Sequence, residues 1–347
     1  MLGLVREVVR RLGPEQLLGT REIGVALEGL GPRVALACLG KPAQEYAAVL
    51  QERLGGRLTG SCVVGLHSGH PIPNEESLAA GRRLLDFVEA VPDDTALLCF
   101  IAGGGSALAE VPRAPFTIDQ IRQRTGELID SGAPINELNR VRASMSRIKN
   151  GGLLEACRAS EVLTLVLADV PSGDPALVAS GPSIRPGARV LRIAGYPEIA
   201  SIAADLIPGA NVGPAFDEPI ESGVAAHVDA ARALAPRTAY VSGGELPSRV
   251  VGPGRGGRNT EFVIRLGAEL ADWPGRWRIA SFATDGSDGA SDSAGGWIDP
   301  ATLRGIDVRP WLARSDSATL LAERGTLFPP LATACNLMDL RIVARDL

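Results

Sequence analysis

The sequence of 347 residues has little of several features that mark specialised classes of protein. Its five cysteines lie far apart and form no C-x-x-C pair, which argues against a zinc site or a secreted disulfide scaffold and fits a reducing compartment. No uncharged apolar run reaches the about 18 residues of a membrane span, and early charges interrupt the apolar start MLGLVREVVRR. We therefore expect a cytoplasmic protein that does not enter a membrane.

Positive charge is not in excess. Lys and Arg number 35 against 40 Asp and Glu, a net charge of −5, so a nucleic-acid backbone is not expected as a partner. Hydrophobic residues make up 45% and charged residues 22%, the balance of a globular protein with a sizeable core. The length favours about two domains.

Lysine is almost absent. Of the 35 Lys and Arg residues only Lys41 and Lys149 are lysines. Arginine is therefore used at nearly every position where either residue would serve. A lysine kept under this bias is a candidate for a position that needs a compact, strongly hydrated ammonium rather than a planar guanidinium.

Short apolar runs alternate with longer amphipathic stretches, which predicts an α/β fold with a mostly parallel sheet. The expected strands are 33–39, 95–102, 162–168, 238–242, 247–251 and 278–283. The expected helices are 42–54, 75–90, 118–131, 151–159, 223–235 and 260–271. The stretch 208–222 is rich in Pro, Gly and acidic residues and lacks periodicity, which predicts a domain linker there.

Several expected strands end in loops that could carry chemistry, because ligands bind at the carboxyl ends of strands in open α/β sheets. Gly103-Gly104-Gly105-Ser106 could present backbone N–H groups to a phosphate or carboxylate, although a glycine-rich turn has the same composition. His70 lies in a stiff loop before a helix that Asn74 could cap; it could bind substrate or be structural. Asp169 and Asp174 could hold Mg²⁺ or simply form turns.

The segment 252–257 fits G-x-G-x-x-G between an expected strand and an expected helix, the context of a dinucleotide site. Arg255 and Arg258 beside these glycines favour instead a clamp on concentrated negative charge. The segment 284–292 carries three acids, Asp285, Asp288 and Asp292, for which a Mg²⁺ site or a general base remains open. Taken alone, the segment 252–257 leaves a dehydrogenase and a site that binds concentrated negative charge both under consideration.

Taken in order, the loops resemble those of the glycerate kinases whose carboxyl-terminal part is the MOFRL domain. The matching segments cover nearly the whole chain: GKPA (40–43), GHPIPNEESLAAG (69–81), GGGSAL (103–108), NELNRVRASMSRIKNGG (136–152), LADVPSGDPALVASGPS (167–183), SGGE (242–245), GRGGRNTEF (254–262) and TDGSDGASDSAG (284–295). The chain departs from the family at 141–146, which reads VRASMS, and in the terminal loop 330–339, which reads PLATACNLMD.

The resemblance implies two α/β domains, a larger Rossmann-like domain at 1–215 and a smaller MOFRL domain at 216–347, with the active site in the cleft between them. It implies ATP-dependent phosphorylation of D-glycerate to 2-phosphoglycerate with Mg²⁺. Protein positioning and charge suffice for such a transfer. Small molecules are the expected partners. The oligomeric state stays open, and a homodimer is compatible with the sequence.

The resemblance also assigns site residues. Catalytic roles fall on Lys41, Arg255 and Asp285. Phosphate or nucleotide binding falls on Gly103, Gly104, Gly105, Ser106, Lys149, Ser180 and Gly181. Substrate binding falls on His70, Glu245, Arg258 and Asn259, and metal binding on Asp169, Asp174 and Asp288. Two alternatives remain: an NAD(P)H-dependent hydroxypyruvate reductase, and a divergent homologue that acts on or only binds another small hydroxy acid.

Overall fold

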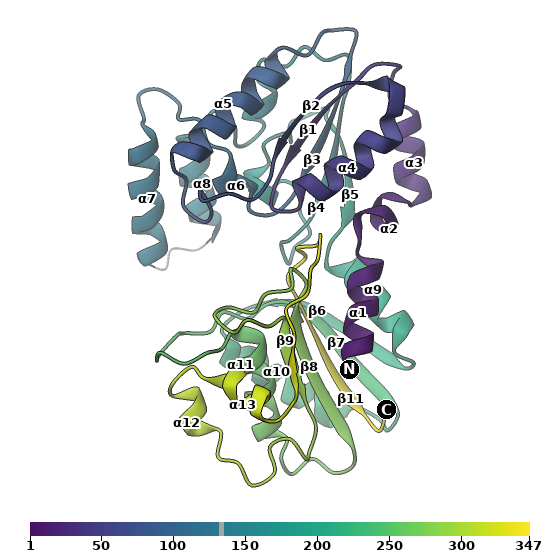
Figure 1. Ribbon diagram of the computed structural model, residues 1–347, viewed down its shortest axis with the longest axis vertical. Coiled ribbons are helices and arrows are strands. Elements are labelled where there is room, and N and C mark those ends of the chain that lie inside the picture. The colour runs from purple at the N-terminus through teal and green to yellow at the C-terminus, as the bar shows by residue number, and fades with distance from the viewer. Residues whose placement is uncertain (132–134) are drawn as a thin grey trace. The chain divides into compact units, whose positions relative to one another are not determined.

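A computed structural model describes residues 1–131 and 135–347 and divides the chain into two compact units (Figure 1). The parallel-sheet unit comprises Pro14–Asp169 and Gly173–Ala194, and the mixed-sheet unit comprises Met1–Gly13, Val170–Ser172 and Gly195–Leu347. The described residues contain no helix that is both long and apolar enough to span a bilayer.

The parallel-sheet unit is built on five parallel strands in the order β2-β1-β3-β4-β5. Its strands are β1 (Val34–Leu39), β2 (Leu58–Val64), β3 (Ala96–Ile101), β4 (Val162–Leu167) and β5 (Arg189–Ala194). Its helices are α2 (Pro14–Leu18), α3 (Arg21–Glu28), α4 (Ala43–Leu54), η1 (Gly55–Arg57), α5 (Glu75–Glu89), α6 (Gly105–Leu108), α7 (Ile118–Asp130), α8 (Ile135–Ser144), η2 (Gly152–Leu154) and η3 (Val178–Ser180).

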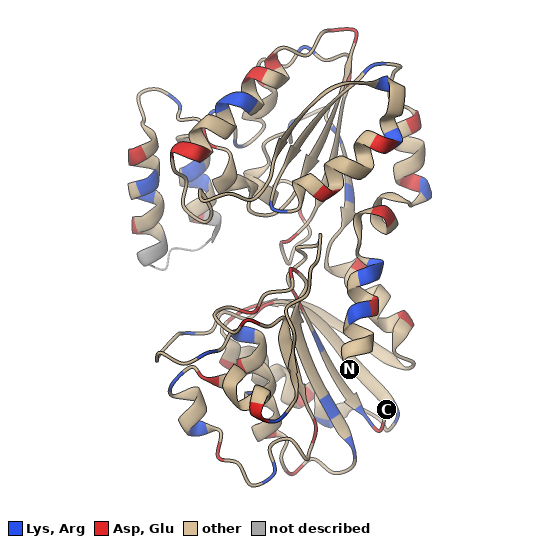
Figure 2. Ribbon diagram, viewed as in Figure 1, with Lys and Arg blue, Asp and Glu red and all other residues tan. Residues whose placement is uncertain are grey.

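The central strands of this sheet are apolar along their whole length. β1 and β3 are fully buried, and β1, β3 and β4 carry no charged residue (Figure 2). A strand covered on both faces reads as a continuous apolar run, which is why these strands were predicted correctly. The sheet order reverses between β1 and β3, and the carboxyl ends of the strands at such a switch point form the usual ligand crevice.

The mixed-sheet unit has a six-stranded sheet in the order β10-β9-β8-β11-β7-β6. Its strands are β6 (Ala210–Asp217), β7 (Thr238–Glu245), β8 (Trp277–Ala283), β9 (Gly295–Ile298), β10 (Leu327–Phe328) and β11 (Asp339–Arg345). Its helices are α1 (Leu2–Arg11), α9 (Tyr196–Leu206), α10 (Ile220–Ala233), α11 (Arg258–Glu269), α12 (Arg309–Leu312) and α13 (Ser317–Glu323).

In this unit β11 runs antiparallel between β7 and β8, which are therefore parallel to each other. The amino end of β11 thus lies beside the carboxyl ends of β7 and β8, and Asp339 is in register with both Gly244 and Ala283. The main apolar core forms between the sheet, α10 and α11, around buried Phe262.

Three elements predicted from the sequence are absent or different. The linker at 208–222 contains β6, paired with β7; a register shift between Val212 and Ala215, at Gly213 and Pro214, breaks its pattern. Residues 247–251 form an exposed loop, not a strand. Of the helix expected at 151–159 only η2 exists, because Gly151 is held in the left-handed region against Gly181.

The units also differ from the predicted domain bounds. Residues 1–13 and 195–215 lie in the same compact unit as the carboxyl-terminal part. The reason is that α9 packs on β6 and β7 while α1 packs on α9, contacts that no local sequence pattern reports.

His227 makes folding of the mixed-sheet unit sensitive to acid. Its ring is buried between Gly223 O (2.6 Å) and Ser242 Oγ (2.6 Å), and burial lowers its pKa from 6.5 to about 3. Between these two values the unfolded chain binds a proton that the folded chain does not. The free energy of unfolding therefore falls as pH is lowered from 6.5 toward 3, by about 2 kcal/mol at pH 5.

Urea unfolding of the wild type and of His227→Gln at a series of pH values measures this effect. The variant is expected to be less stable at pH 7.5 but to lose less stability between pH 7 and pH 5. Equal pH slopes for the two proteins would contradict the assignment.

Candidate active site

The first group of functional side chains lies at the switch point of the parallel-sheet unit. Lys41 follows β1, and its N–H donates to Gly103 O (2.9 Å) at the end of β3. Gly104 has φ +80°, and a Cβ on it would stand 2.9 Å from Lys41 Cγ and 3.3 Å from His70 Cδ2. The lysine and the histidine therefore both lie against the glycine-rich loop, and only glycine fits there.

The histidine loop is fixed by the start of α5. Asn74 accepts hydrogen bonds from the N–H groups of Glu76 and Ser77, and the Ser77 hydroxyl accepts from Asn74 N–H. This capping box is the cap expected from the sequence. Burial, Lys41 and Arg142 together lower the pKa of His70, so the ring is neutral near pH 7.

The glycine-rich loop is also held from the other side. Ser106 Oγ lies 3.0 Å from Ser180 Oγ, and a Cβ on Gly105 would stand 2.8 Å from the Ala179 Cβ. Ala179, Ser180 and Asn150 all have positive φ without being glycine. Such backbone conformations cost free energy and cluster at functional sites.

A cavity of about 550 Å³ adjoins these residues and is lined by Asn139, Arg140, Ala143, Ser144, Asn150, Ala176, Leu177 and Ser180. Its volume is that of a small-molecule site. Ala143 and Ser144 stand in the segment 141–146 where the chain departs from the family pattern, so that departure shapes this cavity.

Lys149 does not reach the loop surface. Its side chain is 1% exposed and forms a buried ion pair with Glu110. Burial lowers its pKa to about 8 although Glu110 opposes the change. The geometry gives this lysine a structural role, in contrast to the predicted nucleotide contact. Gly181 has φ +58°, and its carbonyl oxygen accepts a hydrogen bond from Gly151 N–H (2.8 Å). It therefore holds the turn that follows Lys149.

Asp169 and Asp174 lie in the loop after β4. Asp169 is half-buried, whereas Asp174 is exposed and accepts from Ala176 N–H (2.9 Å). In the described part of the chain no three His, Cys, Asp or Glu side chains form a group able to hold a metal ion.

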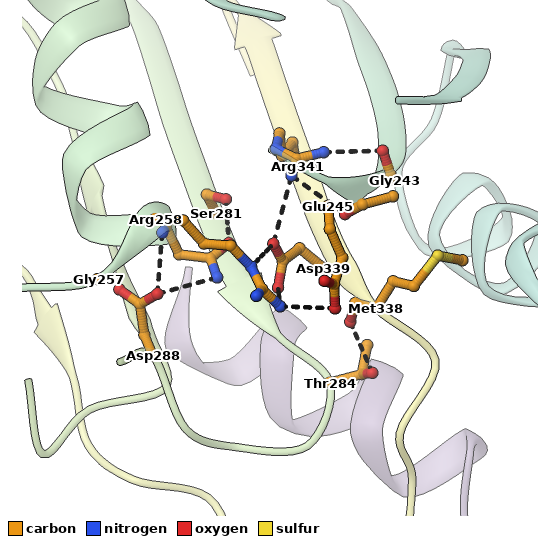
Figure 3. A network of polar contacts seen from close by, with 12 residues as sticks. Gly243, Glu245, Gly257, Arg258, Ser281, Thr284, Asp288, Met338, Asp339 and Arg341 are labelled. Carbon is orange, nitrogen blue, oxygen red and sulfur yellow. Dashed lines mark hydrogen bonds and ion pairs between the residues drawn. The ribbon is translucent and has the colours of Figure 1, made fainter. Parts of the chain in front are cut away.

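The second group lies where β7 and β8 end and β11 begins, in the middle of the mixed sheet (Figure 3). Arg258, at the start of α11, donates to both oxygens of Asp339 (2.6 and 3.0 Å) and to Glu245 at the end of β7 (2.9 Å). Burial lowers the pKa of Arg258, but the carboxylates of Asp339 and Glu245 outweigh it and raise the pKa above its ordinary value.

Sequence reasoning missed Asp339 and Arg341. Both are buried, and Arg341 donates to Gly243 O (2.7 Å), Gly244 O (3.1 Å) and Asp339 (3.3 Å). Burial lowers the pKa of Arg341 to about 10. The sequence pattern that could have indicated them is Asp339 and Arg341, two positions apart and therefore on the same face of the otherwise apolar strand 339–345.

Asp288 is the cap of α11. Its two oxygens accept from the N–H groups of Asn259 and Thr260 (both 2.9 Å) and from both of their side chains. Burial raises its pKa even though these donors oppose the change. With 2% exposure and four donors, the carboxyl group has no oxygen left for the predicted metal. Asn259, donor to Asp288, is equally buried.

The two remaining predicted catalytic residues lie outside this network. Arg255 is exposed, and its Nη2 donates to Asp292 (2.8 Å). Asp285, which follows β8, is half-buried and accepts from Ser287 N–H (3.2 Å).

The glycines of 252–257 serve close packing within the chain. A Cβ on Gly254 would stand 2.5 Å from Arg314 O, and one on Gly257 would stand 2.3 Å from Asp288 O. The bare backbone that a dinucleotide loop turns toward a pyrophosphate here faces the protein itself. The segment before it is a loop rather than a strand, so the context required of a dinucleotide site is missing.

Comparisons with known proteins agree on one family. Residues 4–194 match the family described as "Domain of unknown function (DUF4147)", and residues 238–339 match the MOFRL family. A "Putative hydroxypyruvate reductase" of Agrobacterium vitis is 30% identical over 87% of this chain and 82% of the relative. A "D-glycerate 2-kinase" of Thermotoga maritima is 28% identical over 89% and 90%. The crystal structure of a glycerate kinase from Thermotoga maritima superposes with a TM-score of 0.89 at 25% identity, covering 99% of this chain and 98% of that one.

Replacing Asp288 separates a helix cap from a metal ligand. Asp288→Ala leaves the amino end of α11 without its acceptor and should lower the free energy of unfolding by about 1–3 kcal/mol. Asp292→Asn, which removes an exposed charge from the same loop and keeps a residue type that tolerates the positive φ there, is the control and should change stability little. Urea unfolding measures both; an unchanged Asp288→Ala stability would contradict the capping role.

Replacing Lys149 tests whether it is structural. Lys149→Met leaves Glu110 charged, buried and without its partner, which should cost about 3–5 kcal/mol of stability. Lys41→Met removes the other lysine and should leave stability nearly unchanged. A Lys149→Met protein as stable as the wild type but with weakened nucleotide binding would favour the nucleotide contact instead.

Proposed function

This chain belongs to the MOFRL family of glycerate kinases, and from that premise we propose that it transfers a phosphoryl group from ATP to D-glycerate and forms 2-phosphoglycerate. Relatives that carry the name glycerate 2-kinase support the reaction and its product. The proposal rests on residues of each unit taken separately.

The observation that carries the proposal is the placement of Lys41. Its side chain lies against Gly104 of the glycine-rich loop, at the reversal of the sheet order. Among the described residues no carboxylate pairs with its ammonium group. A cation without a protein counter-ion, next to a loop at the carboxyl ends of β1 and β3, fits the binding of a phosphoryl group. In this role Lys41 neutralises negative charge on the transferring group or orients glycerate.

Asp285 is suited to act as the general base that accepts the proton of the glycerate hydroxyl. It is half-buried and follows β8, and one of its oxygens accepts a single backbone N–H, from Ser287. Arg255 would add positive charge to the transferring phosphoryl group once its exposed pair with Asp292 opens. Because exposed pairs of this kind are weak, opening this one costs little free energy.

Carboxylates other than that of Asp288 could serve as ligands of Mg²⁺. Mg²⁺ is usually held by one or two carboxylates together with waters and substrate phosphates, rather than by a dedicated cage of protein ligands. The carboxylates of Asp169, Asp174 and Asp285 are candidates on this chemistry, since each lies in a loop and none is fully buried. When bound with the nucleotide, the ion neutralises phosphate charge.

The first experiment measures ADP release by purified protein with Mg·ATP, with and without D-glycerate. We expect release that depends on glycerate and that falls about 10²–10³-fold in Lys41→Ala, because an electrostatic contact to the transition state is lost. Proton-coupled ³¹P NMR of the product identifies the position: a phosphate on the C2 methine gives a doublet and one on the C3 methylene a triplet.

Two control variants make the result specific. Lys41→Arg keeps a positive charge after β1 and should retain more activity than Lys41→Ala. Arg33→Gln removes an exposed basic residue just before the same strand and should retain full activity. Folded protein that releases no ADP, but oxidises NADPH when hydroxypyruvate is added, would replace the kinase by the reductase. Without either reaction, other hydroxy acids are to be screened.

A further inference from the structure

Arg142 is a buried cation with too few acceptors. It lies on α8, and its residue is 8% exposed. Nη2 donates to Ser106 O (2.9 Å) in the glycine-rich loop, and Nε is buried with no acceptor in the parts of the chain that the structure describes. A guanidinium has five N–H donors, and the acceptors that the described residues supply here are one neutral carbonyl for Nη2 and none for the buried Nε.

The surroundings of Arg142 carry an excess of positive charge. Glu110 is the acid that influences it, and Glu110 already pairs with Lys149. Lys41 lies against Gly104 and Arg142 donates to Ser106 O, so the two cations both contact residues 103–106. Arg142 is buried and Lys41 is half-buried, and within the described residues neither has a carboxylate of its own. For Arg142 this is costly, because a buried charge is unfavourable unless it is paired.

The Arg258 network in the other unit shows the opposite balance. There, Arg258 and Arg341 are matched by Asp339 and Glu245, with each pair joined by hydrogen bonds. In that network each arginine is hydrogen-bonded to a carboxylate, although Arg341 Nε has no acceptor among the described residues. In the parallel-sheet unit the three cations Arg142, Lys41 and Lys149 have between them one carboxylate, that of Glu110. Two positive charges there are therefore left without a counter-ion among the described residues.

We propose that Arg142 and Lys41 together bind an oxyanion group of a substrate beside residues 103–106, which makes Arg142 an anion-binding residue of this enzyme. The oxyanion is a phosphate of the nucleotide or the carboxylate of the hydroxy acid; naming these two sources rests on the proposed function. Guanidinium suits either group because its N–H pairs match two oxygens at once.

The adjoining cavity gives the rest of such a ligand room. Ser180, whose hydroxyl contacts that of Ser106, also lines the cavity of about 550 Å³. Asn139, Ser144 and Asn150 add polar groups to its wall. A ligand anchored by its anion at residues 103–106 can therefore extend along α8.

Isothermal titration of ADP, D-glycerate and inorganic phosphate into wild type, Arg142→Gln and Arg142→Lys tests the proposal without turnover. We expect Arg142→Gln to weaken binding about 10–100-fold, the effect of losing a charged hydrogen bond, with Arg142→Lys in between. Loss confined to ADP and phosphate identifies the nucleotide, and loss confined to glycerate identifies the carboxylate. Arg147→Gln, an exposed arginine five residues along, should bind as the wild type does.

Thermal unfolding without ligand separates binding from a structural role. Removing an unpaired buried charge should leave the melting temperature of Arg142→Gln unchanged or higher, while stabilisation by the affected ligand is lost. A lower melting temperature with unchanged affinities would overturn the proposal, as would wild-type protein that binds none of the three probes. If Arg142→Gln does not fold, the same comparison is decided by Arg142→Lys.

The kinase proposal and this one fail in different ways. Binding that depends on Arg142 in a protein that phosphorylates no glycerate leaves the anion site standing without the kinase. Full affinity and full turnover in Arg142→Gln leave the kinase standing without this role for Arg142.

Discussion

The compensation of buried charge is the constraint on which both groups of polar residues depend. The mixed-sheet unit brings Asp339 to the amino end of β11, between the carboxyl ends of β7 and β8, where it joins Arg258 to Arg341. Because that carboxylate is fully buried, its two arginines must hold their positions, and they fix the start of α11 and the end of β7. The parallel-sheet unit meets the same requirement by pairing Lys149 with Glu110, whereas Arg142 is buried with no acceptor for its Nε among the described residues.

Loop chemistry follows from strand direction. In a parallel sheet every strand ends at the same edge, so the segments after β1 and β3 meet although more than sixty residues separate them. The hydrogen bond from Lys41 N–H to Gly103 O and the close fit of Gly104 against Lys41 result from that geometry. The strained turns at Asn150 and Ser180 bring two further loops to the same place. Lys41 and Arg142 thereby both contact residues 103–106.

Much of the fold could be predicted because the buried strands β1, β3 and β4 are apolar without interruption and their loops carry Gly, Ser and Asp. The edge strand β6 could not, since its residues are mostly exposed and a bulge at Gly213 and Pro214 resembles a linker. Helix caps raised a similar difficulty. Asn74 adjoins the helix that it caps, whereas Asp288 caps α11 from 29 residues away, and a pattern local in sequence can show only the first kind of cap.

By itself the sequence determined the α/β class, the family, and the residue types that gather after the strands, because each is written in local patterns of apolar runs, glycines and acids. Only the tertiary structure decided which charged residues face a ligand and which face each other. Lys41 and Lys149 are both rare lysines beside glycine-rich motifs, yet one lies unpaired against Gly104 and the other is buried against Glu110. The role of a charge is set by its burial and its counter-ion, and both come from parts of the chain that are distant in sequence.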